Sequence, residues 1–329
     1  MARVLRTMLW LMAGLAAAVA ALWVVAPPER VETDIVFDGA AVPDDVDTWL
    51  AAREARVPNL RPDNAKHVVW ADAPGRRTDL VLVYVHGFSA TLWEVRPLVD
   101  RIAADLGANL FYTRLTGHGR DGPAMAEATA SAWIEDVAEA MAVARRLGDR
   151  IVVIGTSNGG TLTAALAADP ALAATREGLA GIVLISPNFR PANPAAPLLS
   201  MPGASVAMPM ALGDIRGFQP RNEDHARRWT TRYPTVALLP MQAIVAHTID
   251  LDFTAADVPA LFYFSPADTI VDATVTEAVA GLWAGPTTIA RIDPPPDDDP
   301  DAHVIVGDIL SPGHTPEAIA TIGRWIEDL

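Results

Sequence analysis

Short apolar runs alternate with longer amphipathic stretches along most of the chain. The runs end in glycine, proline or small polar residues, as buried strands of a parallel sheet do. The stretches between them repeat apolar residues at intervals of three and four, which is typical of helices packed on one side. The pattern predicts strands at 81–88, 109–113, 151–154, 181–186, 260–265 and 287–292. It predicts helices at 91–105, 131–147, 158–168, 272–283 and 315–328.

Regular alternation of strand and helix is typical of a doubly wound, mostly parallel sheet with helices on both faces. It begins only after a polar, proline-spotted segment at 27–78, which we interpret as a linker and an N-terminal extension. Within this segment, 31–37 has the composition of a strand and 44–56 has helical spacing. Residues 67–70 are predicted as a further strand, paired antiparallel at the sheet edge.

The alternation stops between residues 187 and 259, so the expected α/β core comprises 79–186 and 260–329. We interpret 187–259 as a cap or lid inserted into that core. Its aromatic residues suit contact with an apolar acyl or alkyl group, or simply pack the insert onto the core. Its arginines suit an anionic ligand group, or ion pairs with surface acids. The aromatic residues are Phe189, Phe218, Trp229 and Tyr233, and the arginines are Arg227, Arg228 and Arg232.

Composition and charge narrow the classes of partner. Half of the 329 residues are hydrophobic, which is enough for a large core. With 25 basic and 40 acidic residues the net charge is −15, which argues against nucleic-acid binding through backbone attraction. The chain has no cysteine, and this excludes disulfides, thiol catalysis and cysteine-ligated metals.

The N-terminus predicts a membrane-targeting segment. Arg3 and Arg6 precede an uncharged stretch at 8–26, whose helical length of roughly 28 Å nearly matches a hydrocarbon core of about 30 Å. We expect residues 1–26 to form an anchor, a transmembrane helix that leaves the rest of the chain on the non-cytoplasmic side. Two alternatives remain open: a cleaved signal peptide, with a signal-peptidase-like site at 18–20, and a buried helix.

The sequence Gly-Thr-Ser-Asn-Gly at 155–159 directly follows the predicted strand at 151–154 and precedes a predicted helix. A strand that enters a Gly-x-Ser-x-Gly turn and leaves as a helix forces the serine into a tight bend with an exposed hydroxyl. The flanking glycines lack the Cβ atoms that would crowd this bend. Ser157 is therefore the predicted nucleophile.

A serine nucleophile of this type needs an acid and then a histidine later in the sequence. Asp268 lies where the strand beginning at residue 260 breaks into a turn, and His303 follows the last predicted strand. His303 would accept the serine proton, and Asp268 would orient and stabilise the imidazole. His314 competes with His303, and Asp272 competes more weakly with Asp268.

The tetrahedral intermediate of such a reaction needs N–H donors for its oxyanion. We expect one to be the backbone N–H of Asn158, the residue after the nucleophile. The other is predicted to be the N–H of Phe88, in the His-Gly-Phe sequence that ends the strand at 81–88.

Together, His-Gly-Phe, Gly-x-Ser-x-Gly and the ordered acid and base resemble the α/β-hydrolase superfamily, from about residue 79 to the C-terminus. The Gly-His-Gly sequence at 117–119 is similar to a loop of the monoacylglycerol lipase and serine aminopeptidase branch. The resemblance implies that His118 is structural, and we expect the same of His86. Two features depart from the branch: Asn158 stands where relatives often carry Gln or Met, and 187–259 matches no familiar cap.

The expected function is that of a membrane-anchored or exported serine hydrolase that cleaves carboxylic esters through an acyl-enzyme, with lipid-like substrates favoured. An aminopeptidase or amidase with the same triad is the alternative. A non-catalytic binding module would lack part of the triad, and no part is missing. We expect no cofactor and no metal, because His-Glu-x-x-His is absent and the aspartates at 297–301 are interpreted as a solvated loop.

Overall fold

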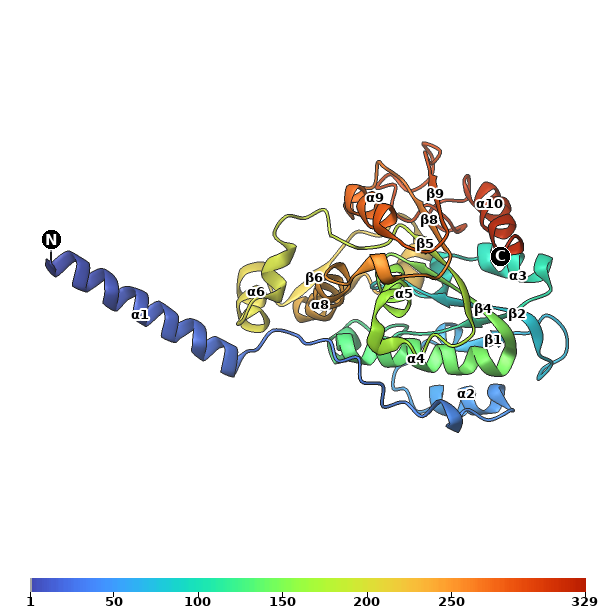
Figure 1. Ribbon diagram of the computed structural model, residues 1–329, viewed down its shortest axis with the longest axis horizontal. Helices are drawn as coiled ribbons and strands as arrows, with labels where there is room; N and C mark the ends of the chain where they lie inside the picture. Colours follow the sequence, from blue (N-terminus) through green and yellow to red (C-terminus); the bar gives the residue numbers. More distant parts are fainter. Residues whose placement is uncertain (1) are drawn as a thin grey trace.

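The computed structural model describes residues 2–329, apart from the side chains at positions 2, 11, 13 and 15–21. A seven-stranded sheet forms its centre, in the order β1-β3-β2-β4-β5-β8-β9 (Figure 1). All neighbouring strands run parallel except β1, which pairs antiparallel with β3 at the edge, as predicted. The strands are β1 (His67–Val69), β2 (Thr78–Val85), β3 (Asn109–Tyr112), β4 (Gly148–Thr156), β5 (Leu179–Ile185), β8 (Ala260–Phe264) and β9 (Thr287–Arg291).

Helices cover both faces of this sheet, which confirms the predicted doubly wound architecture. In β4, Ile151 and Val153 belong to one apolar cluster, whereas Val152 and Ile154 belong to the cluster on the opposite face. Side chains alternate across a strand, so a continuous apolar run serves two buried faces at once. One face packs on α4 (Ala130–Leu147), α5 (Asn158–Ala168) and α9 (Ala273–Leu282), and the other on α3 (Leu98–Leu106) and α10 (Thr315–Glu327).

Two predicted elements differ. The helix expected at 91–105 is divided into a 3₁₀ turn, η3 (Leu92–Glu94), and α3, because Pro97 lacks the N–H that a continuous helix needs. The strand expected at 31–37 does not form. Instead the N–H groups of Val36 and Phe37 donate to the carboxylate of Glu135 on α4, which satisfies them without a partner strand.

The segment expected as a cap contains more regular structure than predicted. It holds α6 (Ala204–Leu212), α7 (Glu223–Arg228), α8 (Leu238–Ile249) and an antiparallel pair, β6 (Ile215–Gly217) with β7 (Arg232–Pro234). Ala243 and Ile244 of α8 belong to the main apolar core. The expected division, in which 187–259 lies outside the α/β core, therefore does not hold for α8.

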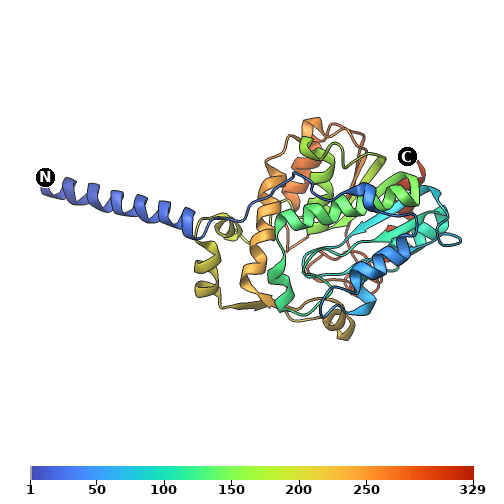
Figure 2. The same cartoon turned by 90° about the horizontal axis from the view of Figure 1, so that it is seen from below.

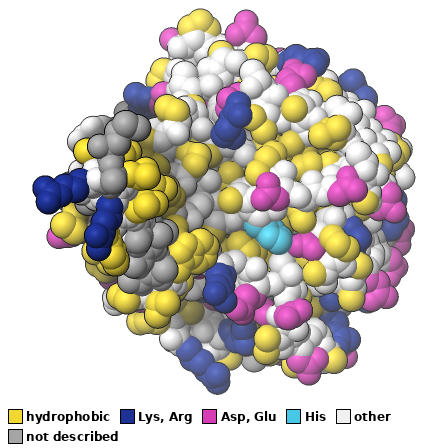
Figure 3. All heavy atoms as spheres, turned by 60° about the vertical axis from the view of Figure 1, so that its left-hand side comes forward, with side chains coloured by type: hydrophobic (Ala, Val, Ile, Leu, Met, Phe, Trp, Pro, Cys, Tyr) yellow, Lys and Arg dark blue, Asp and Glu magenta, His cyan; other side chains and the backbone are white. Residues whose placement is uncertain are grey.

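The first helix, α1 (Ala2–Val25), projects away from the body in both ribbon views (Figures 1 and 2). Its base meets the cap, where the N–H of Gly203 donates to the carbonyl of Ala26 at 2.8 Å. Among the described side chains of α1, hydrophobic ones such as Trp10 and Val24 are exposed, and Figure 3 shows further hydrophobic side chains scattered over this side of the molecule. Within the described residues, no helix combines the length and apolar character that crossing a bilayer requires. The transmembrane helix predicted at 8–26 thus has no support here, and the side chains of the signal-peptidase-like site predicted at 18–20 lie outside those described.

Candidate active site

The turn between β4 and α5 holds Ser157 in a strained conformation. Its φ is 52° and its ψ is −116°, a region that residues with a Cβ rarely adopt. A Cβ at Gly155 would lie 2.4 Å from the carbonyl oxygen of Gly159, and one at Gly159 would lie 2.0 Å from that of Val85. Both glycines are therefore required for the turn, and the turn presents the hydroxyl of Ser157 at the start of α5.

The structure brings the predicted serine, histidine and aspartate together. His303 Nε2 lies 3.0 Å from Ser157 Oγ, and His303 Nδ1 lies 2.8 Å from Asp268 Oδ2. The other carboxylate oxygen of Asp268 accepts the N–H groups of Ile270 and Val271, which fixes its direction. These contacts define a tautomer in which Nδ1 donates to the aspartate and Nε2 accepts from the serine.

The charges around His303 favour its protonated form. Burial opposes that form, but the charge and hydrogen bond of the Asp268 carboxylate, together with the charges of Asp299 and Glu94, outweigh it, so the pKa of the imidazole is raised. A raised pKa suits a group that must hold a proton between attack and release of the leaving group.

The aspartates before His303 hold its loop. The carboxylate of Asp299 accepts the N–H groups of His303 and Val304, and the carboxylate of Asp298 accepts those of Gly313 and His314. Both aspartates are buried. The interpretation of 297–301 as a solvated loop was therefore wrong for these residues, since their side chains replace the missing backbone partners of an irregular segment.

The two backbone N–H groups expected to form an oxyanion hole differ from the neighbouring N–H groups, which already have acceptors. The N–H of Gly87 donates to Glu94, and that of Ser89 donates to His118. Among the described residues, no acceptor is found for the N–H of Phe88 or of Asn158, the first residue of α5. Two N–H groups are thus left available next to Ser157.

Two buried histidines support this loop, as expected. His86 Nε2 accepts the N–H of Leu115, and His118 Nε2 accepts the N–H of Ser89. Burial lowers the pKa of His86 to about 4 and lowers that of His118 well below its usual value. Both rings are therefore neutral at physiological pH and remain hydrogen-bond acceptors.

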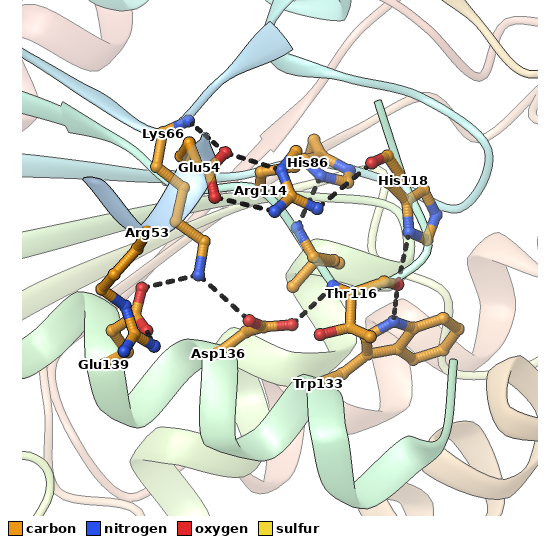
Figure 4. Close-up of polar contacts among 11 residues, drawn as sticks. Arg53, Glu54, Lys66, His86, Arg114, Thr116, His118, Trp133, Asp136 and Glu139 are labelled. Atoms are coloured by element: carbon orange, nitrogen blue, oxygen red, sulfur yellow. Dashed lines mark hydrogen bonds and ion pairs between the residues drawn. The ribbon is translucent and has the colours of Figure 1, made fainter. Parts of the chain in front are cut away.

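An ion network lies behind these histidines (Figure 4). Arg114 donates twice to Glu54 from α2 (Val46–Glu54) and once to the carbonyl of His118. Lys66 binds Asp136 and Glu139 of α4, and Asp136 also accepts the N–H of Thr116. We call Glu54, Lys66, Arg114, Asp136 and Glu139 the N-terminal ion network. Through it, part of the segment expected as linker and extension holds the Gly-His-Gly loop.

A cavity of about 520 Å³ opens above Ser157 and His303. Its walls are mostly apolar and come largely from the cap and the loops around it. They include Phe218, Trp229, Tyr233, Leu238, Met241 and Ile270. The cavity is large enough for a small ester, and its lining suits an acyl chain.

The rival residues lie elsewhere. His314 binds the hydroxyl of Tyr263, and Asp272 caps α9 and pairs with Arg190. Arg228 pairs with Asp63, whereas the cap arginine that lines the cavity is Arg221, which pairs with Asp301. Sequence reasoning missed Arg221, Glu94 and the inward aspartates, because no local pattern marks them. Within residues 2–329 no group of His, Asp or Glu side chains is arranged to hold a metal ion.

The fold and this geometry are those of an α/β-hydrolase with a nucleophile at the strand-to-helix turn. The family model described as serine aminopeptidase, S33, matches residues 76–284, which is more than half of the chain. The chain therefore belongs to that family, and it is a serine hydrolase of the lipase- or esterase-like kind.

Known proteins agree with this assignment. A thermostable monoacylglycerol lipase from Bacillus sp. (strain H-257) is 29% identical over 194 residues, which are 58% of this chain and 71% of that one. A structure of the metagenome-derived lipolytic enzymes LipS and LipT superimposes with a TM-score of 0.62 at 20% identity, covering 82% of this chain and 100% of that one. A soluble variant of monoglyceride lipase from Saccharomyces cerevisiae gives 0.59 at 11% identity, covering 80% and 91%. The structural likenesses show the fold.

Proposed function

We propose that this enzyme hydrolyses carboxylic esters through an acyl-enzyme formed on Ser157. One observation carries the proposal: a hydrogen-bond chain runs from Asp268 through His303 to Ser157 at the floor of an apolar cavity, beside two N–H groups for which the described part of the chain offers no acceptor. Each part answers one need of acyl transfer: a base, an activated hydroxyl and donors for the oxyanion.

The reaction proceeds in two halves. Ser157 Oγ attacks the ester carbonyl while His303 Nε2 takes its proton, and the carbonyl oxygen becomes an oxyanion held by the N–H groups of Phe88 and Asn158. Collapse of this intermediate breaks the bond to the alcohol oxygen, which receives the proton from His303. Water then attacks the acyl-enzyme with His303 again as base, and the carboxylic acid and free serine result.

We favour a substrate with one acyl chain. The cavity walls are mostly apolar, and the relatives named above include monoacylglycerol and monoglyceride lipases. An amide or peptide substrate is the second candidate, because the matching family is described as a serine aminopeptidase. Both use the same residues, so only the turnover of matched ester and amide substrates separates them.

The test compares the wild type with Ser157→Ala on p-nitrophenyl esters of increasing chain length and on p-nitroanilides. The variant should lose about 10⁶-fold in kcat and all labelling by a fluorophosphonate, with its thermal midpoint little changed. Full activity in Ser157→Ala would show that Ser157 is not the nucleophile. Preference for anilides over esters would favour the amidase, and activity confined to the shortest esters would contradict a lipid-like substrate.

For the location of the enzyme we propose export, with the catalytic part on the non-cytoplasmic side. Arg3 and Arg6 before an uncharged stretch support this, as do exposed apolar side chains on α1 such as Trp10. A reporter phosphatase that is active only outside the cytoplasm, fused after residue 40, should be active, and the same fusion without residues 1–26 should be inactive. Equal activity of the two fusions would refute export. Fractionation then tells an attached protein from a cleaved one.

A further inference from the structure

A second carboxyl group lies close to Ser157 and is not part of the Asp268–His303–Ser157 chain. Glu94 ends η3, between β2 and α3, and is only 3% exposed although it borders the cavity. Among the described residues no lysine or arginine forms an ion pair with it. A buried carboxyl group without a cationic partner is costly unless hydrogen bonds compensate it.

Two donors meet one oxygen of this group. The N–H of Gly87 donates to Glu94 Oε1, and the hydroxyl of Tyr84 donates to the same oxygen at 2.8 Å. The Tyr84 hydroxyl also lies 3.0 Å from Oγ1 of Thr156, the residue before Ser157. A continuous hydrogen-bonded bridge therefore joins the loop after β2 to the end of β4, where the nucleophile begins.

Close packing fixes the bridge on its other sides. A Cβ at Gly87 would lie 3.1 Å from Glu94 Oε2 and 3.2 Å from the Cβ of Ser157. Gly87, which has no side chain, therefore separates the carboxyl group of Glu94 from the nucleophile. Gly307, in the loop after His303, has a φ of +94°, and a Cβ there would lie 2.1 Å from the carbonyl oxygen of Glu94. The segment that carries Glu94 thus touches both the oxyanion loop and the histidine loop.

We propose that Glu94 is a positioning residue of the oxyanion hole. By holding the N–H of Gly87, it keeps the following peptide turned so that the N–H of Phe88 points at the oxyanion formed on Ser157. Donors of this kind work only when they are aimed in advance at the position the oxyanion will occupy. The inference rests on the proposed function, since it presupposes hydrolysis at Ser157.

The same carboxyl group acts electrostatically on the base. Burial raises the pKa of Glu94 to about 7, against the hydrogen bonds from Gly87 and Tyr84 and the charge of His303. The titratable groups that face it are Tyr84 on β2 and His303, whose own carboxylate neighbours are Asp268 and Asp299. Ionised Glu94 favours protonated His303, so replacing it by a neutral residue lowers the pKa of His303.

The experiment measures kcat, KM and the pH dependence of kcat/KM for Glu94→Leu, Glu94→Gln and Tyr84→Phe, with Glu177→Leu on an exposed turn as the matched control. Glu94→Leu should lose roughly 10- to 100-fold in kcat with KM little changed, because the oxyanion hole acts in the transition state. Affinity for a trifluoromethyl ketone, whose serine adduct carries an oxyanion, should fall in parallel.

Glu94→Gln keeps an acceptor oxygen for Gly87 and Tyr84, and should recover most of the kcat that Glu94→Leu loses. Its ascending limb of kcat/KM should move to lower pH, because the His303 imidazole loses a neighbouring negative charge. Tyr84→Phe removes the hydroxyl that binds Glu94 but leaves the carboxyl group in place. It should lose roughly 3- to 10-fold in kcat, as expected for the loss of one hydrogen bond of about 1 kcal/mol. Glu177→Leu should match the wild type.

The inference is overturned if Glu94→Leu keeps the wild-type kcat, or if its loss appears only in KM. It is also overturned if Glu94→Gln and Glu94→Leu lose the same amount of activity. If Glu94→Leu does not fold, an unmoved pH limb in Glu94→Gln together with wild-type kcat in Tyr84→Phe overturns it. Ester hydrolysis that survives Ser157→Ala refutes the proposed function instead. An essential Ser157 with indifferent Glu94 and Tyr84 variants refutes this inference alone.

Discussion

His303 and His86 are both buried near Ser157, yet their surroundings push the two imidazoles in opposite directions. His303 faces the Asp268 carboxylate, and its pKa is raised, whereas His86 meets mainly backbone groups, and burial lowers its pKa to about 4. Desolvation acts on both rings, so the carboxylate partner makes the difference. One histidine is prepared to carry a proton, and the other is prevented from taking one.

The same contrast holds for the groups around them. The Asp268–His303–Ser157 chain ends in an open cavity, so its last hydroxyl can react. The N-terminal ion network is closed, with Glu54 pairing with Arg114 and Lys66 pairing with two acids. We infer that buried charged groups take part in the reaction where their hydrogen-bond chain ends in the cavity. Where every charged group is paired, as in the N-terminal ion network, they stabilise the positions of the loops they join.

The largest effect should follow from removing His303 from the Asp268–His303–Ser157 hydrogen-bond chain. His303→Ala should lower kcat by about 10⁴-fold or more, because the serine loses its base. His314→Ala is the matched control, and it should keep its activity because His314 binds Tyr263 rather than the serine. Ester turnover and thermal unfolding of both variants check this. Loss of activity in the His314 variant alone would reverse the assignment of the base.

Breaking the closed network should affect stability rather than chemistry. Glu54→Leu leaves the guanidinium of Arg114 buried without its carboxylate, which should cost about 3–5 kcal/mol in the free energy of unfolding. The double variant Glu54→Leu/Arg114→Met should recover much of this loss, because no unpaired charge remains. Denaturant unfolding measures both. A single variant that loses less than about 1 kcal/mol would show that the pair is not effectively buried.

The smallest effect sharpens the contrast between the histidines. The folded pKa of His86 lies below the value of 6.5 expected when unfolded, so its contribution to stability is complete above pH 6.5 and is lost as the pH falls towards 4. Between pH 7 and pH 5, His86 should therefore cost the wild type about 2 kcal/mol. His86→Gln lacks this part of the pH dependence. Parallel stability curves for the two proteins would contradict the neutral, buried state of His86.

Much of the fold was predictable because its signals are local. The apolar run at 151–154 followed by a glycine-flanked serine defined β4, the turn and α5 without any knowledge of other segments. The antiparallel edge strand β1 was also predicted. The strand expected at 31–37 failed because the distant carboxylate of Glu135 supplies its acceptors, a partner that the local sequence does not reveal.

The site divides in the same way. Ser157, Asp268 and His303 were found from motif, order and position after strands, and the structure brings their side chains within hydrogen-bond distance. The burial of Asp298 and Asp299 was not found, because aspartates among prolines look solvated until the backbone they bind is in place. Glu94 has no distinguishing sequence pattern, and its proposed role depends on the residues that surround it only in the folded protein.

The sequence by itself therefore determined the strands, the sharp turn at Ser157 and the identity of the reacting side chains, since these depend on periodicity and on glycines a few residues apart. The tertiary structure alone decided which charges are buried, which amides remain unpaired and which carboxyl group borders the nucleophile. These properties arise where the loops at Gly87, Glu94, His118 and His303 meet. Burial and electrostatic environment are set by atoms far away in sequence, and they do not exist until the chain has folded.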